Sequence, residues 1–360
     1  MLHRSICITF IMMKENSQYC FTDTRGEDIF LYRLSNNRGT EVIISNYGAI
    51  ITAFRYMTRN DLPNDIVLGF DDVKQYSGKE YLKNYPWFGA AVGRYGNRIR
   101  NARFEIDGQE YQLTKNSGNN QLHGGLEGFD KKVWKMEDVG TGMLLLSHRS
   151  PDGDEGYPGN LEVRILYTLN DADELSYEFT ANTDKPTAIN LTHHSYFNLN
   201  NGKGDIKDHE LKIPADHYLE QDENLAVTGN LVAVKNTSHD FTQRKKIAAD
   251  WDETTGYDQS FVTAKPAKEF GLVAEAWSAK SGLKLEVWST EPVVHFYSGV
   301  WIPSVKGKNG TNYTPFSGFC LETQIHPNAI NLPHFPNTVL RPGETYHQKT
   351  VYKVIQEPLK

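Results

Sequence analysis

Short segments in which apolar and polar residues alternate recur along this chain, and they restrict its fold more than any other feature. In LEVRILYTL (161–169) every second residue is apolar and most residues between them are polar. Such alternation indicates a β-strand that is buried on one side. The segments ELSYEFTAN (174–182) and GLKLEVWST (282–290) repeat it, and helical periodicity is scarce. We therefore expect an all-β fold.

Turn signals and the lack of internal divisions extend this prediction. The dipeptide Asp107-Gly108 lies between two alternating runs, which is the strongest short-range signal for a β-hairpin. A short helical turn is predicted over Asp71–Ser77, which opens with acidic residues. No linker, charge block or repeat divides the 360 residues. The sequence predicts a large antiparallel β-sandwich in which residues 21–360 form a single domain.

Residues 1–20 are expected to lie outside that domain as an N-terminal extension. Arg4 precedes a short apolar run from Ile6 to Met13, which resembles a weak signal peptide without a small-x-small cleavage site. The run is much shorter than the roughly 20 residues of a membrane span. Either it is a signal or the chain truly starts at Met12 or Met13, and we favour the second reading. We expect a cytoplasmic protein, or a periplasmic one if the signal is real.

Composition excludes several classes of function. The net charge of −7, without any basic run, argues against nucleic acid as a partner, and no segment predicts a membrane span. Cys7, Cys20 and Cys320 are too scattered for a disulfide framework or a CxxC metal motif. The chain is rich in aromatic residues, with 19 Tyr, 17 Phe and 6 Trp, and aromatic rings can stack on sugars.

Two adjacent histidines stand in the segment LTHHSYFNL (191–199). In an extended segment the side chains of His193 and His194 point to opposite faces, so the two cannot easily hold one metal ion. At most one of them is expected to be chemical. Several glycine-containing segments carry further polar groups that suit a polyhydroxylated ligand; these groups are Asn97, Arg98, His123, Asp258 and Glu322. Together with the aromatic residues, the set suggests a carbohydrate ligand.

These segments also carry a resemblance. VGRYGNRI, NNQLHGG, LTHHSYFNL, GYDQSFV, LETQ and FPNTVLRPGETYHQKTVYKV occur in this order between about Tyr47 and Lys353, and they resemble the motifs of the galactose mutarotase (aldose 1-epimerase) family, bacterial type. The resemblance implies a β-supersandwich that needs no metal and no organic cofactor. It implies interconversion of the α and β anomers of free aldohexoses, galactose and glucose. We expect the protein to be a monomer or a homodimer.

Residue roles follow from the resemblance, position by position. His194 matches the family's general acid, and Glu322 matches its general base. Opening of the sugar ring requires one base for the C1 hydroxyl and one acid for the ring oxygen. The residues that match groups holding the sugar hydroxyls are Asn97, Arg98, His123 and Asp258. Arg94 is either a further ligand or a structural residue.

Four positions depart from the family pattern. His193 replaces a common Asn, Gly96 a common Ala, and Gln259 a common His. His295 stands where a sugar-contacting Gln is often found, and we predict a substrate-binding role for it. The predicted acid and base are intact, so these departures bear on sugar preference more than on chemistry.

Other functions remain open at this stage. A non-catalytic carbohydrate-binding module has no need of both His194 and Glu322. A glycoside hydrolase would use Asp258 and Glu322 as its carboxylate pair. An epimerase of hexose 6-phosphates would need a basic cluster, and only Arg94, Arg98 and Arg100 offer one.

Overall fold

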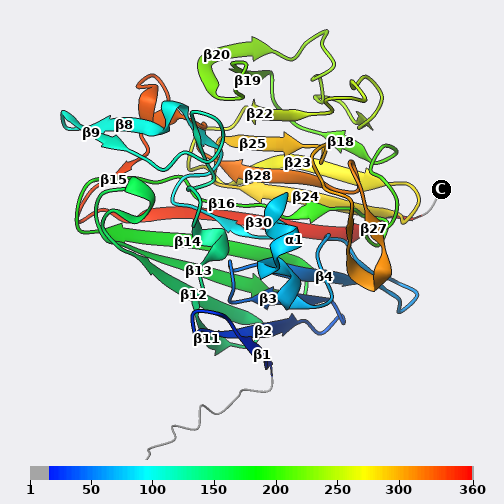
Figure 1. Ribbon diagram of the computed structural model, residues 1–360. Coiled ribbons are helices and arrows are strands. Elements are labelled where there is room, and N and C mark those ends of the chain that lie inside the picture. Colours follow the sequence, from blue (N-terminus) through cyan, green and yellow to red (C-terminus); the bar gives the residue numbers. More distant parts are fainter. Residues whose placement is uncertain (1–15, 359–360) are drawn as a thin grey trace, which may run out of the picture.

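The computed structural model describes residues 16–358, and these residues are folded mainly into β-strands (Figure 1). The apolar run of the predicted N-terminal extension lies outside them. The predicted boundary at residue 21 falls inside strand β1 (Ser17–Thr22), which pairs with the following strand, so residues 17–20 belong to the first sheet. Within residues 16–358, no helix has the length and apolar composition needed to cross a membrane.

The largest sheet is antiparallel and has nine strands. Across the sheet they run β11 (Lys135–Gly140), β12 (Met143–Ser150), β13 (Leu161–Leu169), β14 (Glu174–Thr183), β30 (Tyr346–Gln356), β24 (Leu283–Ser289), β23 (Gly271–Ser278), β18 (Glu210–Lys212) and β21 (Lys245–Lys246). The three alternating segments of the sequence are β13, β14 and β24. All three were correctly predicted as strands.

Two smaller antiparallel sheets accompany the large one. The first contains β1, β2 (Asp28–Ser35), β3 (Glu41–Ser45), β4 (Ile51–Met57) and β5 (Pro63–Asp65) in sequence order. The second has the order β17 (Tyr196–Phe197), β28 (Phe319–Gln324), β25 (Val293–Tyr297), β22 (Asp258–Val262), β19 (His217–Gln221) and β20 (Val227–Ala233).

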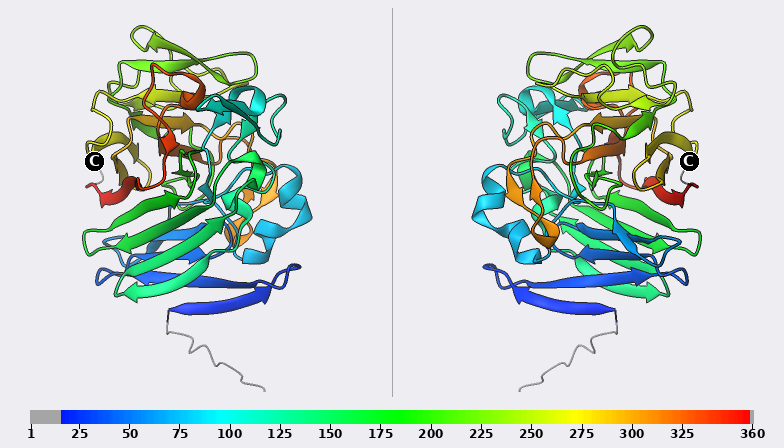
Figure 2. Two further views of the ribbon diagram at one scale, coloured as in Figure 1. Left: turned by 90° about the vertical axis from the view of Figure 1, so that its left-hand side faces the viewer. Right: turned by 90° about the vertical axis from the view of Figure 1, so that its right-hand side faces the viewer.

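Burial along the strands shows how the sheets pack. On β13, Leu161, Val163 and Ile165 are buried while Glu162 and Arg164 are exposed, and β24 alternates in the same way between fully and partly buried positions. The buried side chains join those of β2, β3, β25 and β28 in one apolar core. Because one face of the large sheet carries this core, both smaller sheets cover that same face (Figure 2). The predicted sandwich is confirmed.

Short elements complete the connections. The two-stranded ladders are β6 (Ala91–Val92) with β16 (Thr192–His193), β7 (Arg98–Ile99) with β10 (Gln121–Leu122), β8 (Arg103–Ile106) with β9 (Gln109–Gln112), β15 (Thr187–Ala188) with β29 (Val339–Leu340), and β26 (Val305–Lys306) with β27 (Asn312–Tyr313). The helical segments are α1 (Lys79–Lys83) and the 3₁₀ helices Val73–Ser77, Arg100–Ala102, Phe129–Lys131, Asp154–Gly156, Lys308–Gly310 and Ala329–Asn331.

Both local predictions are confirmed. Asp107 and Gly108 connect β8 to β9 with φ angles of 53° and 79°, and a positive φ at both positions is the signature of the type I′ hairpin turn. The predicted helical turn is the 3₁₀ helix Val73–Ser77. It is capped by the side chain of Asp72, which accepts a hydrogen bond from the Lys74 N–H at 2.9 Å.

Candidate active site

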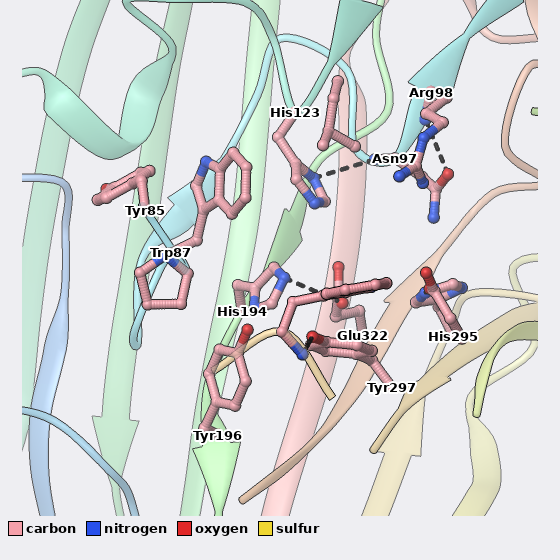
Figure 3. Close-up of a pocket in the computed structure, with 14 residues that line it drawn as sticks. Tyr85, Trp87, Asn97, Arg98, His123, His194, Tyr196, His295, Tyr297 and Glu322 are labelled. Carbon is pink, nitrogen blue, oxygen red and sulfur yellow. Dashed lines mark hydrogen bonds and ion pairs between the residues drawn. The ribbon is translucent and has the colours of Figure 1, made fainter. Parts of the chain in front are cut away.

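A pocket opens where the six-stranded sheet meets three loops of the chain. Strands β22, β25 and β28 supply one wall, and the other lining residues come from segments 85–98, 122–123, 194–196 and position 301. Figure 3 shows these side chains converging from the different elements. The pocket has a volume of about 110 Å³.

The register of the sheet sets one side of the site. Glu322 on β28 lies directly opposite His295 on β25, and His295 lies opposite Ser260 on β22, so the side chains share one face. His295 is held at both ring nitrogens: Nδ1 lies 2.9 Å from the Ser260 hydroxyl, and Nε2 lies 2.8 Å from Oδ1 of Asp258. The imidazole of His295 is therefore fixed between two strands.

His194 approaches Glu322 from the loop between β16 and β17. Its backbone N–H donates to the Ala90 carbonyl at 2.8 Å, which anchors the loop beside β6. The imidazole stacks between the rings of Trp87 and Tyr196, with centroid distances of 6.1 and 5.0 Å. Its Nε2 then lies 3.4 Å from Oε1 of Glu322, and both side chains are almost fully buried.

Asn97 and His123 brace each other at the opposite wall. Both adopt left-handed backbone conformations, with φ of 58° and 52°, and backbone groups of each bond to the other residue. The Asn97 N–H donates to Nδ1 of His123 at 3.2 Å, so a neutral His123 carries its proton on Nε2. The Asn97 side chain in turn accepts from the Arg98 N–H at 2.8 Å.

The glycine after His123 is required by this close packing. Gly124 has a φ of 85°, and a Cβ atom there would lie 1.9 Å from the Gly93 carbonyl oxygen. Glycine at this position thus lets the loop that carries His123 pack against the loop that carries Arg94 and Asn97.

Burial dominates the electrostatics of the pocket. It raises the pKa of Glu322 to about 7 and lowers the pKa of His194 to about 3, because a buried group favours its neutral form. Burial and the neighbouring positive charges also hold the pKa of His123 well below its usual value. Both shifts favour an arrangement of the empty pocket in which Glu322 holds the proton and His194 is neutral.

His295 and Asp258 behave in the opposite way. Burial acts to lower the pKa of His295, but the hydrogen bond and the charge of Asp258 outweigh it and raise that pKa. Burial likewise acts to raise the pKa of Asp258, yet His295, with help from Arg98, holds it below the usual value. The two residues form an ion pair beside Glu322, and the charge of His295 favours the Glu322 carboxylate.

Comparison with known proteins gives this site its context. The bovine galactose mutarotase is 43% identical over 316 residues, which cover 87% of this chain and 90% of the relative. Residues 31–353 match the family described as aldose 1-epimerase. The chain belongs to the aldose 1-epimerase family. Its activity is the interconversion of the α and β anomers of aldoses, as the sequence predicts.

Further relatives agree with this assignment. The aldose 1-epimerase of Escherichia coli K12 is 35% identical over 340 residues, covering 92% of this chain and 97% of the relative. This identity is lower than that to the bovine protein, so the identities do not favour the bacterial type over the mammalian one. A solved GalM/aldose epimerase homologue from C. elegans has a TM-score of 0.84 and 31% identity, covering 91% of this chain and 99% of that one. The predicted mutarotase-like fold is confirmed.

The structure brings all the predicted site residues of this aldose 1-epimerase family member into one pocket. Its lining includes both proposed catalytic residues and the five predicted binding residues: His194, Glu322, Asn97, Arg98, His123, Asp258 and His295. They come from positions far apart in the sequence. Their convergence in one pocket agrees with the predicted site.

Arg94 does not line the pocket. Its guanidinium is buried and donates to the carbonyl oxygens of Ser150, Pro151, Pro158 and Gly159 and to the hydroxyls of Ser150 and Thr187. Of the two roles considered for Arg94, sugar ligand or structural residue, the structural role is correct. Arg100 pairs with Asp222 at 3.2 Å outside the pocket. Arg98 therefore stands without these two arginines, and the basic cluster expected for a hexose 6-phosphate does not form.

Of the four departures from the family pattern, only His295 lines the pocket. His193 is fully buried on the far side of its strand, where Nδ1 lies 3.1 Å from the Ser195 hydroxyl and the ring packs against Tyr177. The two adjacent histidines thus diverge as the extended backbone predicts. At Gly96, an added Cβ would lie 2.9 Å from Oε1 of Gln324, so the glycine makes room for that side chain.

Sequence reasoning missed the aromatic lining of the pocket. Tyr85, Trp87, Tyr196, Tyr297 and Trp301 all contribute to it. Trp301 is 71% exposed although it is a large apolar residue, which makes it the outer edge of the site. The available signals were the YPW segment before the arginine motif and the Tyr that follows His194 in LTHHSYFNL.

The ligand atoms of His123, His194 and Glu322 lie within 4.8 Å of one another, close enough to surround a metal ion. Metal-binding histidines normally donate their second ring N–H to an acceptor. Here Nδ1 of His123 receives the Asn97 N–H instead, so Nε2 carries the proton and offers no lone pair. The hydrogen bonds around the site suit donation to a hydroxyl group better than metal coordination.

Proposed function

We propose that this chain interconverts the anomers of galactose and glucose, with Glu322 as the general base and His194 as the general acid. The observation that carries the proposal is the buried pair itself: the two groups lie 3.4 Å apart in a pocket lined by aromatic rings and polar side chains. A base and an acid that face one small space can act on two different oxygens of one sugar ring.

Ring opening moves one proton onto the protein and one off it. The Glu322 carboxylate takes the proton of the C1 hydroxyl, and the bond between C1 and the ring oxygen breaks. Its electron pair stays on the ring oxygen, which accepts a proton from the His194 imidazolium. The open-chain aldehyde then rotates about the C1–C2 bond, and the same steps in reverse close the ring as the other anomer.

The pair carries a single proton throughout this cycle. The proton lies on His194 when the ring is closed and on Glu322 when it is open. Burial favours the second arrangement in the empty pocket, because it raises the pKa of Glu322 and lowers that of His194. The positive charges of His295 and Arg98 act the other way by favouring the Glu322 carboxylate. These opposing influences support easy proton movement in both directions.

The remaining polar residues are assigned to orienting the sugar. The Nε2–H of His123 donates, the guanidinium of Arg98 donates, and the free oxygen of Asp258 accepts, which suits the hydroxyl groups of a hexose. The side chain of Asn97 already bonds to the Arg98 backbone, so it acts by holding the loop as well as by facing the pocket. The exposed ring of Trp301 offers an apolar face to the C–H groups of the sugar.

Polarimetry tests the proposal. Freshly dissolved α-galactose and α-glucose are followed with and without the protein, and the optical rotation is expected to reach equilibrium faster with it for both sugars. If the protein accelerates the change in optical rotation for neither sugar, the proposal is wrong. Acceleration of one sugar alone would limit the substrate assignment and leave the proposed acid and base in place.

A further inference from the structure

The imidazole of His194 has a second neighbour on the side away from Glu322. Cys320 lies two residues before Glu322 on β28, so both side chains point to the same face of the strand. Its Sγ atom lies 3.4 Å from Nδ1 of His194, within hydrogen-bond range for sulfur, and the residue is fully buried. Nδ1 therefore faces a thiol, and Nε2 faces the carboxylate.

The position of the thiol is set by the sheet. Cys320 pairs with Tyr196 of β17 in the register of the six-stranded sheet, and Tyr196 also stacks on the His194 ring. Neither Cys320 nor Tyr196 can shift without disturbing the pairing of β28 with β17, beside the loop that carries His194. The contact between Cys320 and His194 is thus a fixed feature of the site.

We propose that Cys320 is a positioning residue that selects the working tautomer of His194: its sulfur accepts the Nδ1–H, so that Nε2, on the side of Glu322 and the sugar, is the nitrogen that gains and loses the proton. The imidazolium gives its Nε2 proton to the ring oxygen, and the neutral ring that remains keeps its proton on Nδ1, against the sulfur. The inference deepens the proposed function and rests on the assignment of His194 as the acid.

A thiol suits this task because it stays uncharged. Burial keeps the pKa of Cys320 well above its usual value, so a thiolate does not form beside His194 at neutral pH. A carboxylate in the same place would hold the imidazolium and weaken it as an acid. An apolar side chain would leave Nδ1–H without a partner in a buried site. The thiol sulfur accepts the Nδ1–H in both protonation states of the ring.

The test compares Cys320→Ala and Cys320→Ser with the wild-type protein. Cys20→Ala is the matched control, because Cys20 lies on β1 outside the pocket. Polarimetry gives kcat and KM separately. Cys320→Ala is expected to lower kcat by roughly 2–10-fold, which corresponds to one ordinary hydrogen bond, with KM little changed. Cys320→Ser should recover most of the loss, because a hydroxyl oxygen also accepts the Nδ1–H.

The tautomer itself is read by ¹⁵N NMR of histidine-labelled protein. In the wild type the neutral His194 ring is expected to show a protonated Nδ1 and an unprotonated Nε2. Cys320→Ala should show a mixture of both tautomers, and Cys320→Ser should restore the wild-type pattern. The serine variant should also have a higher His194 pKa than the alanine variant, since its hydroxyl oxygen accepts the Nδ1–H whereas alanine offers no acceptor.

Several outcomes would overturn the inference. A wild-type spectrum with Nδ1 unprotonated in the neutral ring would do so without any variant, even if the alanine variant fails to fold. If the folded alanine and serine variants lose the same fraction of kcat, Cys320 acts through packing and not through a hydrogen bond. If the wild-type protein fails to accelerate mutarotation, the proposed function is wrong. The tautomer seen by NMR still shows in that case whether Cys320 sets the protonation of the His194 ring.

Discussion

Nε2 of His194 and Oε1 of Glu322 lie 3.4 Å apart, although one belongs to a loop and the other to a strand far along the chain. This separation is slightly longer than an ordinary hydrogen bond. The two side chains are therefore not held together by a short hydrogen bond. Oε2 of Glu322 is buried and has no hydrogen-bond partner among the described residues. Both groups remain available to the oxygens of a bound sugar.

The first prediction concerns this pair. Removing a positioned acid or base typically slows a reaction by about 10²–10⁴-fold, so Glu322→Gln and His194→Asn should each lower kcat by that order. Polarimetry measures the rates, and circular dichroism checks that each variant is folded. His193→Asn is the control for the adjacent histidine and should keep nearly the wild-type kcat. A folded His194→Asn variant with unchanged kcat would transfer the acid role to another group.

The second prediction concerns pH. Burial raises the pKa of Glu322 to about 7 and lowers that of His194 to about 3, so the pair holds one proton between these values. The reaction needs that proton. We expect kcat/KM to fall as the pH rises through about 7, where the last proton is lost, and to fall again only at much lower pH. Initial rates across a pH series measure this profile. A steady increase of kcat/KM above neutral pH would contradict it.

The third prediction separates His295 from the catalytic pair. His295→Gln removes a positive charge that lowers the pKa of Glu322, so that pKa should rise and the alkaline limb of kcat/KM should move to higher pH. The variant also loses the ion pair with Asp258, which should change KM or the preference between galactose and glucose. A loss of kcat as complete as that of His194→Asn would place His295 in the acid–base machinery instead.

Local patterns and motifs predict a large part of this molecule. Alternation in 161–169 identifies a half-buried strand, and Asp107-Gly108 identifies a turn, because both signals depend on neighbouring residues alone. The candidate site is predicted in the same way, since His194 and Glu322 each stand inside a recognisable motif. Their motifs indicate chemical type without any knowledge of the contact between them.

The contacts between side chains within the site could not be predicted, because they depend on how distant segments pair in the sheet. The contact of Cys320 with His194 exists because β28 pairs with β17, and no pattern within either segment encodes that pairing. The ion pair between His295 and Asp258 depends likewise on the pairing of β25 with β22. The role of Arg94 was open for the same reason, since its partners lie on segments far from its own motif.

The fourth prediction contrasts two neighbouring arginines. Arg94→Met removes the donor from several buried carbonyl oxygens, and each unsatisfied group costs roughly 1–3 kcal/mol, so the free energy of unfolding should fall by about 3 kcal/mol or more. Arg98→Met should instead raise KM with little loss of stability, because that side chain faces the pocket. Urea denaturation and polarimetry measure the two effects. Equal destabilisation by both substitutions would contradict this division of roles.

The fifth prediction concerns metal ions. The atoms of His123, His194 and Glu322 are close enough to hold one, but Nδ1 of His123 accepts the Asn97 N–H, which leaves the proton on Nε2. Binding a metal there would require the opposite tautomer, and the Asn97 N–H would lose its partner at a cost of roughly 1–3 kcal/mol. We therefore expect dialysis against a chelator to leave kcat and KM unchanged. Loss of activity in chelator-treated, folded protein and its recovery on addition of Zn²⁺ would show that His123 adopts the metal-binding tautomer.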